Sequence, residues 1–358
     1  MPSPTATHRA LIAARNDQRD GNIRGIGREI DRWSVALEER LLGIIAANRG
    51  GREGVLRSVD ALLIGSVQDA ADLLESELRS LATWSYDSAA EAMITSLPAV
   101  FWIKRLAPRP KAVPAPVGES IGPNFDWTSV SAEDEYERVW SGKATAEEVE
   151  EMIRQLEFPP PSPEQIDAIL NATSADDGLS AMQRIKTVTG PQIKQLREKI
   201  VLTFAGDLEG ASAVEALSGT IRELVGNDPG KSTGMNYRAK RIARTEGIRI
   251  SEAGLRETWQ EAGDLIGMIV WHSAKVSASR EDHVARDGKQ YYRNEAGEFI
   301  ASDGERLPEI PLGPNCLCWT SAELRSDLTD GLPPAQYGGW YDAAQVRAER
   351  DRQFASAG

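Results

Sequence analysis

The residues best suited to chemistry lie in the last third of the chain. His283 follows Asp282, and Cys316 and Cys318 are separated by a single residue. Thiolate and imidazole are the ligands that Zn²⁺ prefers, and a structural zinc site uses four of them. With three at hand, the fourth ligand would be His272, an acid such as Asp282, or water. The alternative is two semi-buried thiols at a sheet edge, because Cys-x-Cys is a weaker signal than paired Cys-x-x-Cys.

A carboxylate among small apolar residues predicts a buried ion pair. A helix is expected over 236–262, and Glu246 falls on its stripe of alanines and isoleucines. A lone ionised carboxylate there is costly, so it needs an arginine partner. We predict a structural pair between Glu246 and Arg280. A catalytic acid is the alternative, but no second carboxylate or nucleophile lies at a motif distance, so we expect no enzyme activity.

The same helix carries a row of arginines. Arg238, Arg249 and Arg256 share one side of it when residues are placed at 100° intervals. The row predicts contact with phosphate, including that of DNA. The alternative is a solvated face that Glu252 and Glu257 neutralise.

The first hundred residues predict two long helices that form an antiparallel hairpin, joined by a turn at Asn48-Arg49-Gly50-Gly51. Apolar residues at three- and four-residue steps give the hairpin a narrow seam. We expect this seam to dock on another chain, because so long a hairpin is not compact alone. Its members are Ile23, Ile26, Ile30, Trp33, Leu37, Leu63 and Leu74.

The remaining sequence predicts a mainly α fold that ends in a small α+β module. Helices are expected at 190–205 and 211–226, a buried strand at 268–271, and a strand ladder at 290–292 and 298–300. The expected divisions are the hairpin (1–105), a proline-rich linker (106–125), an acidic helical region (126–229), the α+β module (230–325) and a polar tail (326–358).

Composition narrows the class of protein. The 358 residues carry a net charge of −13, which repels nucleic acid except at a local basic patch. No apolar run is long enough to span a membrane. Two cysteines are too few for a disulfide-stapled scaffold.

Several motifs in a fixed order resemble a known family. The order is Arg241-Ile242-Ala243-Arg244-Thr245-Glu246, a tryptophan-containing strand, Arg280-x-x-His283 with Asp287-Gly288, and Pro314-Asn315-Cys316-x-Cys318. The set is similar to the C-terminal module of the phage Mu F-like head morphogenesis proteins, the minor capsid proteins of tailed phages. The resemblance covers residues 180–325 and leaves the hairpin and the linker outside it.

The chain departs from the family pattern at two places. The family writes His-Pro-x-Cys-Arg-Cys, where this chain has Gly313 for the histidine and Leu317 for the arginine. An aspartate-rich step before Arg-x-x-His is replaced by Ser277-Ala278-Ser279. If the missing histidine is a metal ligand in the family, this chain lacks that ligand.

The resemblance implies a virion component involved in head assembly. It implies binding to the portal protein, with the major capsid or scaffold protein and double-stranded DNA as further partners. The expected location is the capsid interior near the portal vertex, and the host cytoplasm during assembly. No cofactor is expected unless the His283, Cys316 and Cys318 cluster binds zinc. The alternative function is a zinc-dependent hydrolase or toxin-like enzyme module carried in the virion.

Overall fold

The described residues are mainly helical, with one small antiparallel sheet near the C-terminus, as the sequence predicts. The computed structural model describes residues 4–47, 51–106, 138–139, 141, 143–173, 178–181, 183–184, 190–205, 210–226, 234–275, 279–329, 347–348 and 352. Most of the expected linker, the start of the acidic region and nearly all of the tail therefore lie outside the described residues.

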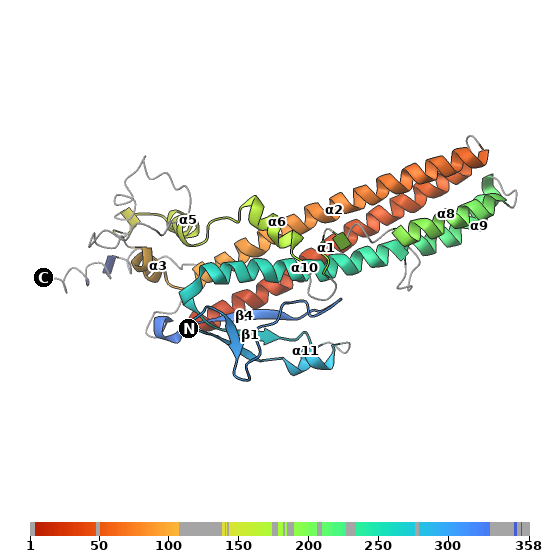
Figure 1. The fold of residues 1–358 in the computed structure, drawn as a ribbon. Coiled ribbons are helices and arrows are strands. Elements are labelled where there is room, and N and C mark those ends of the chain that lie inside the picture. The colour runs from red at the N-terminus through yellow and green to blue at the C-terminus, as the bar shows by residue number, and fades with distance from the viewer. Residues whose placement is uncertain are drawn as a thin grey trace, which may run out of the picture.

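Two long helices form the predicted hairpin. Helix α1 (Pro4–Ala47) has 44 residues and α2 (Gly51–Ser96) has 46, so each is about 65–70 Å long at 1.5 Å per residue. They lie side by side over their whole length and set the long axis of the molecule (Figure 1). None of the described helices is long and apolar enough to cross a membrane.

Other helices of the same chain cover this hairpin. Helix α10 (Gly234–Glu261) packs along both α1 and α2. Helices α8 (Gly190–Ala205) and α9 (Gly210–Val225) pack against the end of the hairpin that is far from the sheet, which we call the distal end (Figure 1). The predicted helices at 190–205 and 211–226 are confirmed to within a residue.

The expectation that another chain covers the hairpin seam is wrong. Six of the seven seam residues are buried within this chain, and Trp33 is partly buried. Leu37 and Leu63 share a core with Leu196 of α8 and Leu217 of α9, whereas Ile26 and Leu74 share one with Ala243 of α10. Helices α8, α9 and α10 of the same chain close the seam, so residues 1–105 are not a separate arm. The buried seam residues are Ile23, Ile26, Ile30, Leu37, Leu63 and Leu74.

A four-stranded sheet lies at the opposite end, which we call the base. Its strands are β1 (Ile266–His272), β2 (Gln290–Arg293), β3 (Phe299–Ala301) and β4 (Trp319–Leu324), in the antiparallel order β3-β2-β1-β4. The short turn η1 (Gly263–Leu265) joins α10 to β1, and helix α11 (Glu281–Ala285) lies between β1 and β2. The buried pair Ile269 and Tyr291 fixes the register of the two central strands.

Short helices complete the covering of the base and the middle. Helix α3 (Ala99–Leu106) packs on α5 (Ala146–Glu157), where Trp102 and Phe158 meet edge to face at 5.8 Å. Helix α6 (Pro163–Asn171) packs against α2 and α10 in the middle of the rod. Helix α12 (Ser326–Thr329) follows β4.

Candidate metal centre

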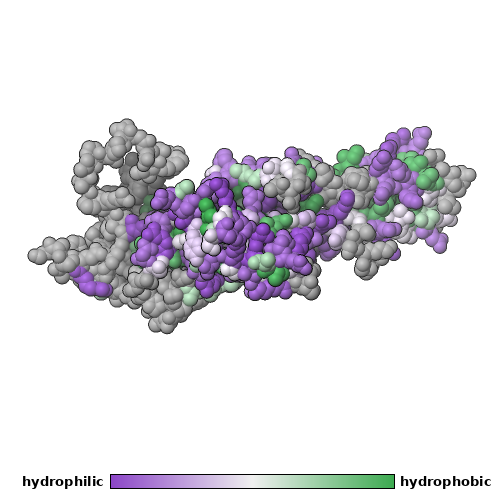
Figure 2. Space-filling view, turned by 60° about the horizontal axis from the view of Figure 1, so that its bottom comes forward, coloured by the Kyte–Doolittle hydropathy of each residue, from purple (hydrophilic) through white to green (hydrophobic). Residues whose placement is uncertain are grey.

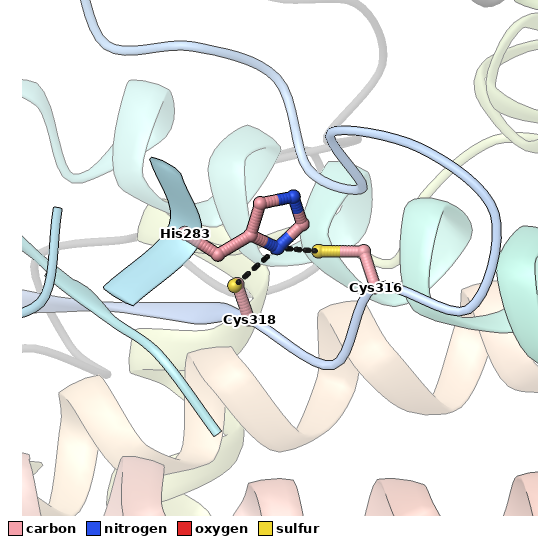
Figure 3. A group of neighbouring side chains, drawn as sticks. All are labelled: His283, Cys316 and Cys318. Carbon is pink, nitrogen blue, oxygen red and sulfur yellow. Dashed lines mark hydrogen bonds between the residues drawn. The ribbon is translucent and has the colours of Figure 1, made fainter. Parts of the chain in front are cut away.

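The fold brings His283, Cys316 and Cys318 together from two separate segments. His283 lies on α11, and the two cysteines lie in the loop that leads into β4. The Nδ1 atom of His283 is 3.5 Å from Sγ of Cys316 and 3.4 Å from Sγ of Cys318 (Figure 3). All three side chains are buried, with exposed fractions of 4%, 3% and 2%. The sequence-predicted ligands therefore form one buried cluster.

Hydrogen bonding alone does not explain the geometry of this cluster. A single imidazole nitrogen has either one proton or one lone pair, so it makes a full hydrogen bond to one sulfur only. Here two sulfurs converge on Nδ1. Zinc bond lengths of about 2.3 Å to sulfur and about 2.0–2.1 Å to nitrogen place the two ligand atoms about 3.5 Å apart in a tetrahedron. The observed separations match that tetrahedral edge, so the three residues fit a zinc ion.

Helix α10 holds the cysteine loop in position. The Asn315 backbone adopts a left-handed φ of 60°. Its N–H donates to Oγ1 of Thr245 over 3.2 Å, which fixes the turn on α10. Cys316 N–H closes the turn on the Gly313 carbonyl at 3.2 Å. Backbone contacts therefore position the cysteine loop on α10.

Arg280 joins the histidine segment to the same loop. Its Nη2 donates to the Pro314 carbonyl over 3.2 Å, and its Nη1 lies 3.4 Å from Nε2 of His283. An arginine only donates, so Nε2 accepts and Nδ1 carries the imidazole proton toward the sulfurs. Binding of a metal ion at Nδ1 requires this proton to move to Nε2, where Oδ2 of Asp282 lies 4.0 Å away.

The two thiols also set each other's charge. The hydrogen bond from Cys318 holds the pKa of Cys316 below that of an ordinary cysteine, at about 6. The same hydrogen bond, together with burial, raises the pKa of Cys318. The hydrogen bond between the two thiols therefore favours the thiolate at Cys316, and thiolate is the form of cysteine that binds metal ions.

A fourth protein ligand is not present among the described residues. His272, one candidate, stacks on Trp319 with ring centroids 3.9 Å apart and bonds to Oγ of Ser321 at 2.8 Å. Asp282, the other, faces Nε2 of His283 and not the sulfurs. Of the histidines, cysteines and acids in the described segments, His283, Cys316 and Cys318 alone make up the group. Of the three candidates for a fourth zinc ligand, these contacts leave water.

The predicted ion pair between Glu246 and Arg280 is wrong. Glu246 is fully buried and pairs with two other arginines, Arg249 at 2.7 Å and Arg184. Arg249 lies one helical turn away on α10, and Arg184 reaches it from a distant segment. Arg280 instead bonds to the cysteine loop. A buried carboxylate with an arginine partner was predictable, but which arginine supplies the partner depends on the tertiary fold.

The three arginines of the predicted phosphate-binding row do not form an exposed surface. Arg249 is buried, and its Nη1 donates to the Ile169 carbonyl at 3.1 Å. Arg256 donates to the Pro308 carbonyl at 2.6 Å, and burial lowers its pKa. Of the three arginines, Arg238 is the exposed one. Helix α10 is sandwiched, so two of these side chains point into protein.

Sequence reasoning missed a second buried polar network. Arg19 and Glu252 form an ion pair at 3.3 Å with both side chains buried, and Thr320 of β4 donates to the same carboxylate at 2.7 Å. The alternative reading of the arginine row places Glu252 on a solvated face, and its burial contradicts that reading. A signal for this network was present in the sequence of α1. Arg15 and Arg19 continue the three- and four-residue spacing of the buried Ile12 and Ile23, so they lie on the same face of the helix.

Comparison with known proteins adds no assignment. No family model, no curated protein and no solved structure matches this chain.

Proposed function

We propose that the chain is a minor head protein of a tailed phage that takes part in head assembly. The observation that supports this proposal is the meeting of the motif residues at one place. In sequence they are spread from Arg241 to Cys318. In space, Arg280 and Thr245 contact the loop that carries Cys316 and Cys318, and both cysteines lie against His283 (Figure 3).

Direct contacts link the motifs to one another. Thr245 accepts from Asn315, and Arg280 donates to Pro314. Asp287 accepts from the Ser273 backbone at 2.9 Å, directly after the tryptophan strand. A chance set of motifs would have no reason to interlock in this way. The contacts therefore support the view that the resembling residues form one structural module, and the assembly role is the function that this resemblance suggests.

Portal binding needs a surface that the chain leaves open. The seam is buried, but Ile64 of α2 is 72% exposed and Leu202 of α8 is 65% exposed. Both belong to the distal half of the rod, where Figure 2 shows hydrophobic surface. A shallow groove of about 600 Å³ between α1 and α2 lies there too, lined by Ile44, Val55 and Leu62 among others. We therefore place the portal contact at the distal end.

Co-purification with the portal protein of the same phage tests this placement. The double variant Ile64→Glu and Leu202→Glu should lose portal binding by at least about tenfold, because burying two charges against an apolar partner is costly. The matched control is Tyr292→Glu, which changes an exposed aromatic residue of the base. Unchanged binding in the double variant, or equal loss in the control, would remove the distal docking surface.

We propose further that the cluster binds zinc in a structural role. The ligand set of one nitrogen and two sulfurs suits zinc, and the burial of all three residues favours a brace between α11 and the β4 loop. A zinc-dependent hydrolase is the alternative, because three protein ligands and one water also make up catalytic zinc sites. We favour the structural role because all three ligand side chains are buried.

Metal analysis of the purified full chain tests the zinc site. We expect about one zinc per chain and a large loss after Cys316→Ser with Cys318→Ser. Cobalt loading should give sulfur-to-metal absorption that the same variant lacks. His272→Gln changes a neighbouring histidine outside the cluster and should keep the metal. Absence of zinc from protein that was expressed in zinc-supplemented medium would contradict the site. So would a loss of zinc in His272→Gln as large as the loss in the cysteine variant.

A further inference from the structure

A groove between α1 and α10 carries an unbalanced positive charge. It has a volume of about 520 Å³, and its lining includes Leu317, the residue between the two cysteines. We call it the arginine groove. Its charged walls are Arg24, Arg28, Lys240 and Arg244, with Asp20 and Asp31, and its floor includes Ile23 and Ile248.

Each acid of the arginine groove pairs with a group other than Arg24, Arg28 and Arg244. Asp31 pairs with Lys240 and accepts from Asn236 at 3.0 Å. Asp20 pairs with Arg19 at 2.9 Å. Within the part of the chain that the structure describes, no acid pairs with Arg24, Arg28 or Arg244, and all three are exposed. Three unpaired guanidinium groups thus face solvent together in a chain whose net charge is −13.

The walls of the groove are rigid and regularly spaced. Arg24 and Arg28 are one turn apart on α1, and Lys240 and Arg244 are one turn apart on α10. The helices are locked together beside them, where Gly247 of α10 lies against Ile23 of α1. From Asp20 to Asp31 the groove follows about 16 Å of helix, which matches about five base-pair steps along the axis of a duplex.

We propose that the arginine groove binds the phosphate backbone of a nucleic acid. Guanidinium groups pair with phosphate through two parallel hydrogen bonds, which favours arginine at such sites. A protein partner fits less well, because the arginines that anchor protein interfaces lie beside aromatic and apolar anchors. None of the large hydrophobic side chains exposed in the described segments lines this groove. The inference does not depend on the proposed role in head assembly.

Binding of a short DNA duplex to the full chain, followed by fluorescence anisotropy between about 50 and 200 mM salt, tests the groove. The triple variant Arg24→Gln, Arg28→Gln and Arg244→Gln should bind at least about tenfold more weakly. Each phosphate contact contributes about −0.9 to the slope of log K against log salt, so the slope should flatten by about 2 to 3. Thermal unfolding of the variant should stay unchanged, because all three residues are exposed.

The control variant removes the same charge elsewhere. Arg57→Gln, Arg197→Gln and Arg306→Gln change arginines whose side chains are 78%, 59% and 75% exposed and which lie outside the groove. This variant should retain most of the binding and most of the salt slope. Equal loss in both triple variants would overturn the proposal, as would no duplex binding by the unchanged protein at about 50 mM salt. Binding of inorganic phosphate without binding of the duplex would overturn the assignment to nucleic acid.

Discussion

Buried charges of this protein are held by partners that come from different helices. Glu246 is paired twice, and Arg19 and Glu252 pair between α1 and α10. The composition and the helical stripe around Glu246 were enough to predict a buried carboxylate with an arginine. They were not enough to choose Arg184 and Arg249 over Arg280, because spacing along one helix shows only neighbours on that helix.

Because Glu246 pairs with two arginines, its removal should lower the stability of the fold. Glu246→Ala should destabilise the fold by about 3 kcal/mol, since it leaves two arginines without their buried counter-charge. Urea unfolding measures the change. The exposed pair of Glu29 and Arg32 provides the control, and Glu29→Ala should cost less than about 0.5 kcal/mol. A Glu246→Ala variant as stable as the control would show that the pair contributes nothing.

His8 gives the fold a pH dependence. It is fully buried, and its Nδ1 lies 3.3 Å from the Ala92 carbonyl. Burial lowers its pKa from 6.5 to about 4, so the folded chain resists protonation that the unfolded chain accepts. The contribution of the neutral His8 to the free energy of unfolding is complete above pH 6.5. It is lost as the pH falls toward 4, by about 1.4 kcal/mol per pH unit.

Comparison of the unchanged protein with His8→Gln isolates this effect, because both proteins share the same carboxylates. Below pH 6.5 the free energy of unfolding of the unchanged protein should fall faster than that of the variant. Parallel curves between pH 7.5 and 5 would mean that His8 is not titrating as its burial requires.

At the scale of the elements, the close approach of α1 and α10 depends on one glycine. A Cβ at Gly247 would lie 2.9 Å from Cγ1 of Ile23 and 3.3 Å from Cδ2 of Leu81. Gly247→Ala should therefore destabilise the protein by about 1–3 kcal/mol, although alanine is the better helix former.

A glycine-to-alanine change is expected to stabilise the protein where the added Cβ meets open space. Gly65 in α2 has nothing within 4 Å of an added Cβ. Gly65→Ala should stabilise the protein by about 0.5–1 kcal/mol through helix propensity alone. Thermal unfolding of the two variants side by side checks both, and stabilisation by Gly247→Ala would show that the two helices do not lie so close.

The elements themselves were largely predictable, since helices and central strands follow apolar periodicity. Strand β1 and the β2–β3 ladder fall where the sequence places them. Strand β4 was missed, because its residues Trp319 to Leu324 include threonine, serine and glutamate. Its buried threonine and serine become interior only through pairing with β1 and packing on α1. That environment depends on distant residues, and no local pattern reports it.

At the scale of the whole molecule, periodicity shows that a helix face will be buried but not which chain covers it. The seam was assigned to a partner, whereas α8, α9 and α10 of the same chain close it. Deleting 1–105 would therefore strip the core from those helices. Portal binding is better tested by single exposed residues such as Ile64, which leave the rod intact.

The start of α1 contacts β4 and α10 at the base of the rod. Arg9 at the start of α1 pairs with Glu323 of β4, and Arg15 donates to the Ser251 carbonyl of α10 at 3.1 Å. The hairpin is thus clamped by segments that follow it by more than a hundred residues.

This order of segments has a consequence during synthesis on the ribosome. The hairpin is finished at Ser96, but the helix that closes it ends only at Glu261. At about 5–20 residues per second, translation needs about 10–30 seconds to bridge that interval. For this time the nascent hairpin presents an uncovered isoleucine and leucine ridge, so cellular chaperones should engage the growing chain before its release.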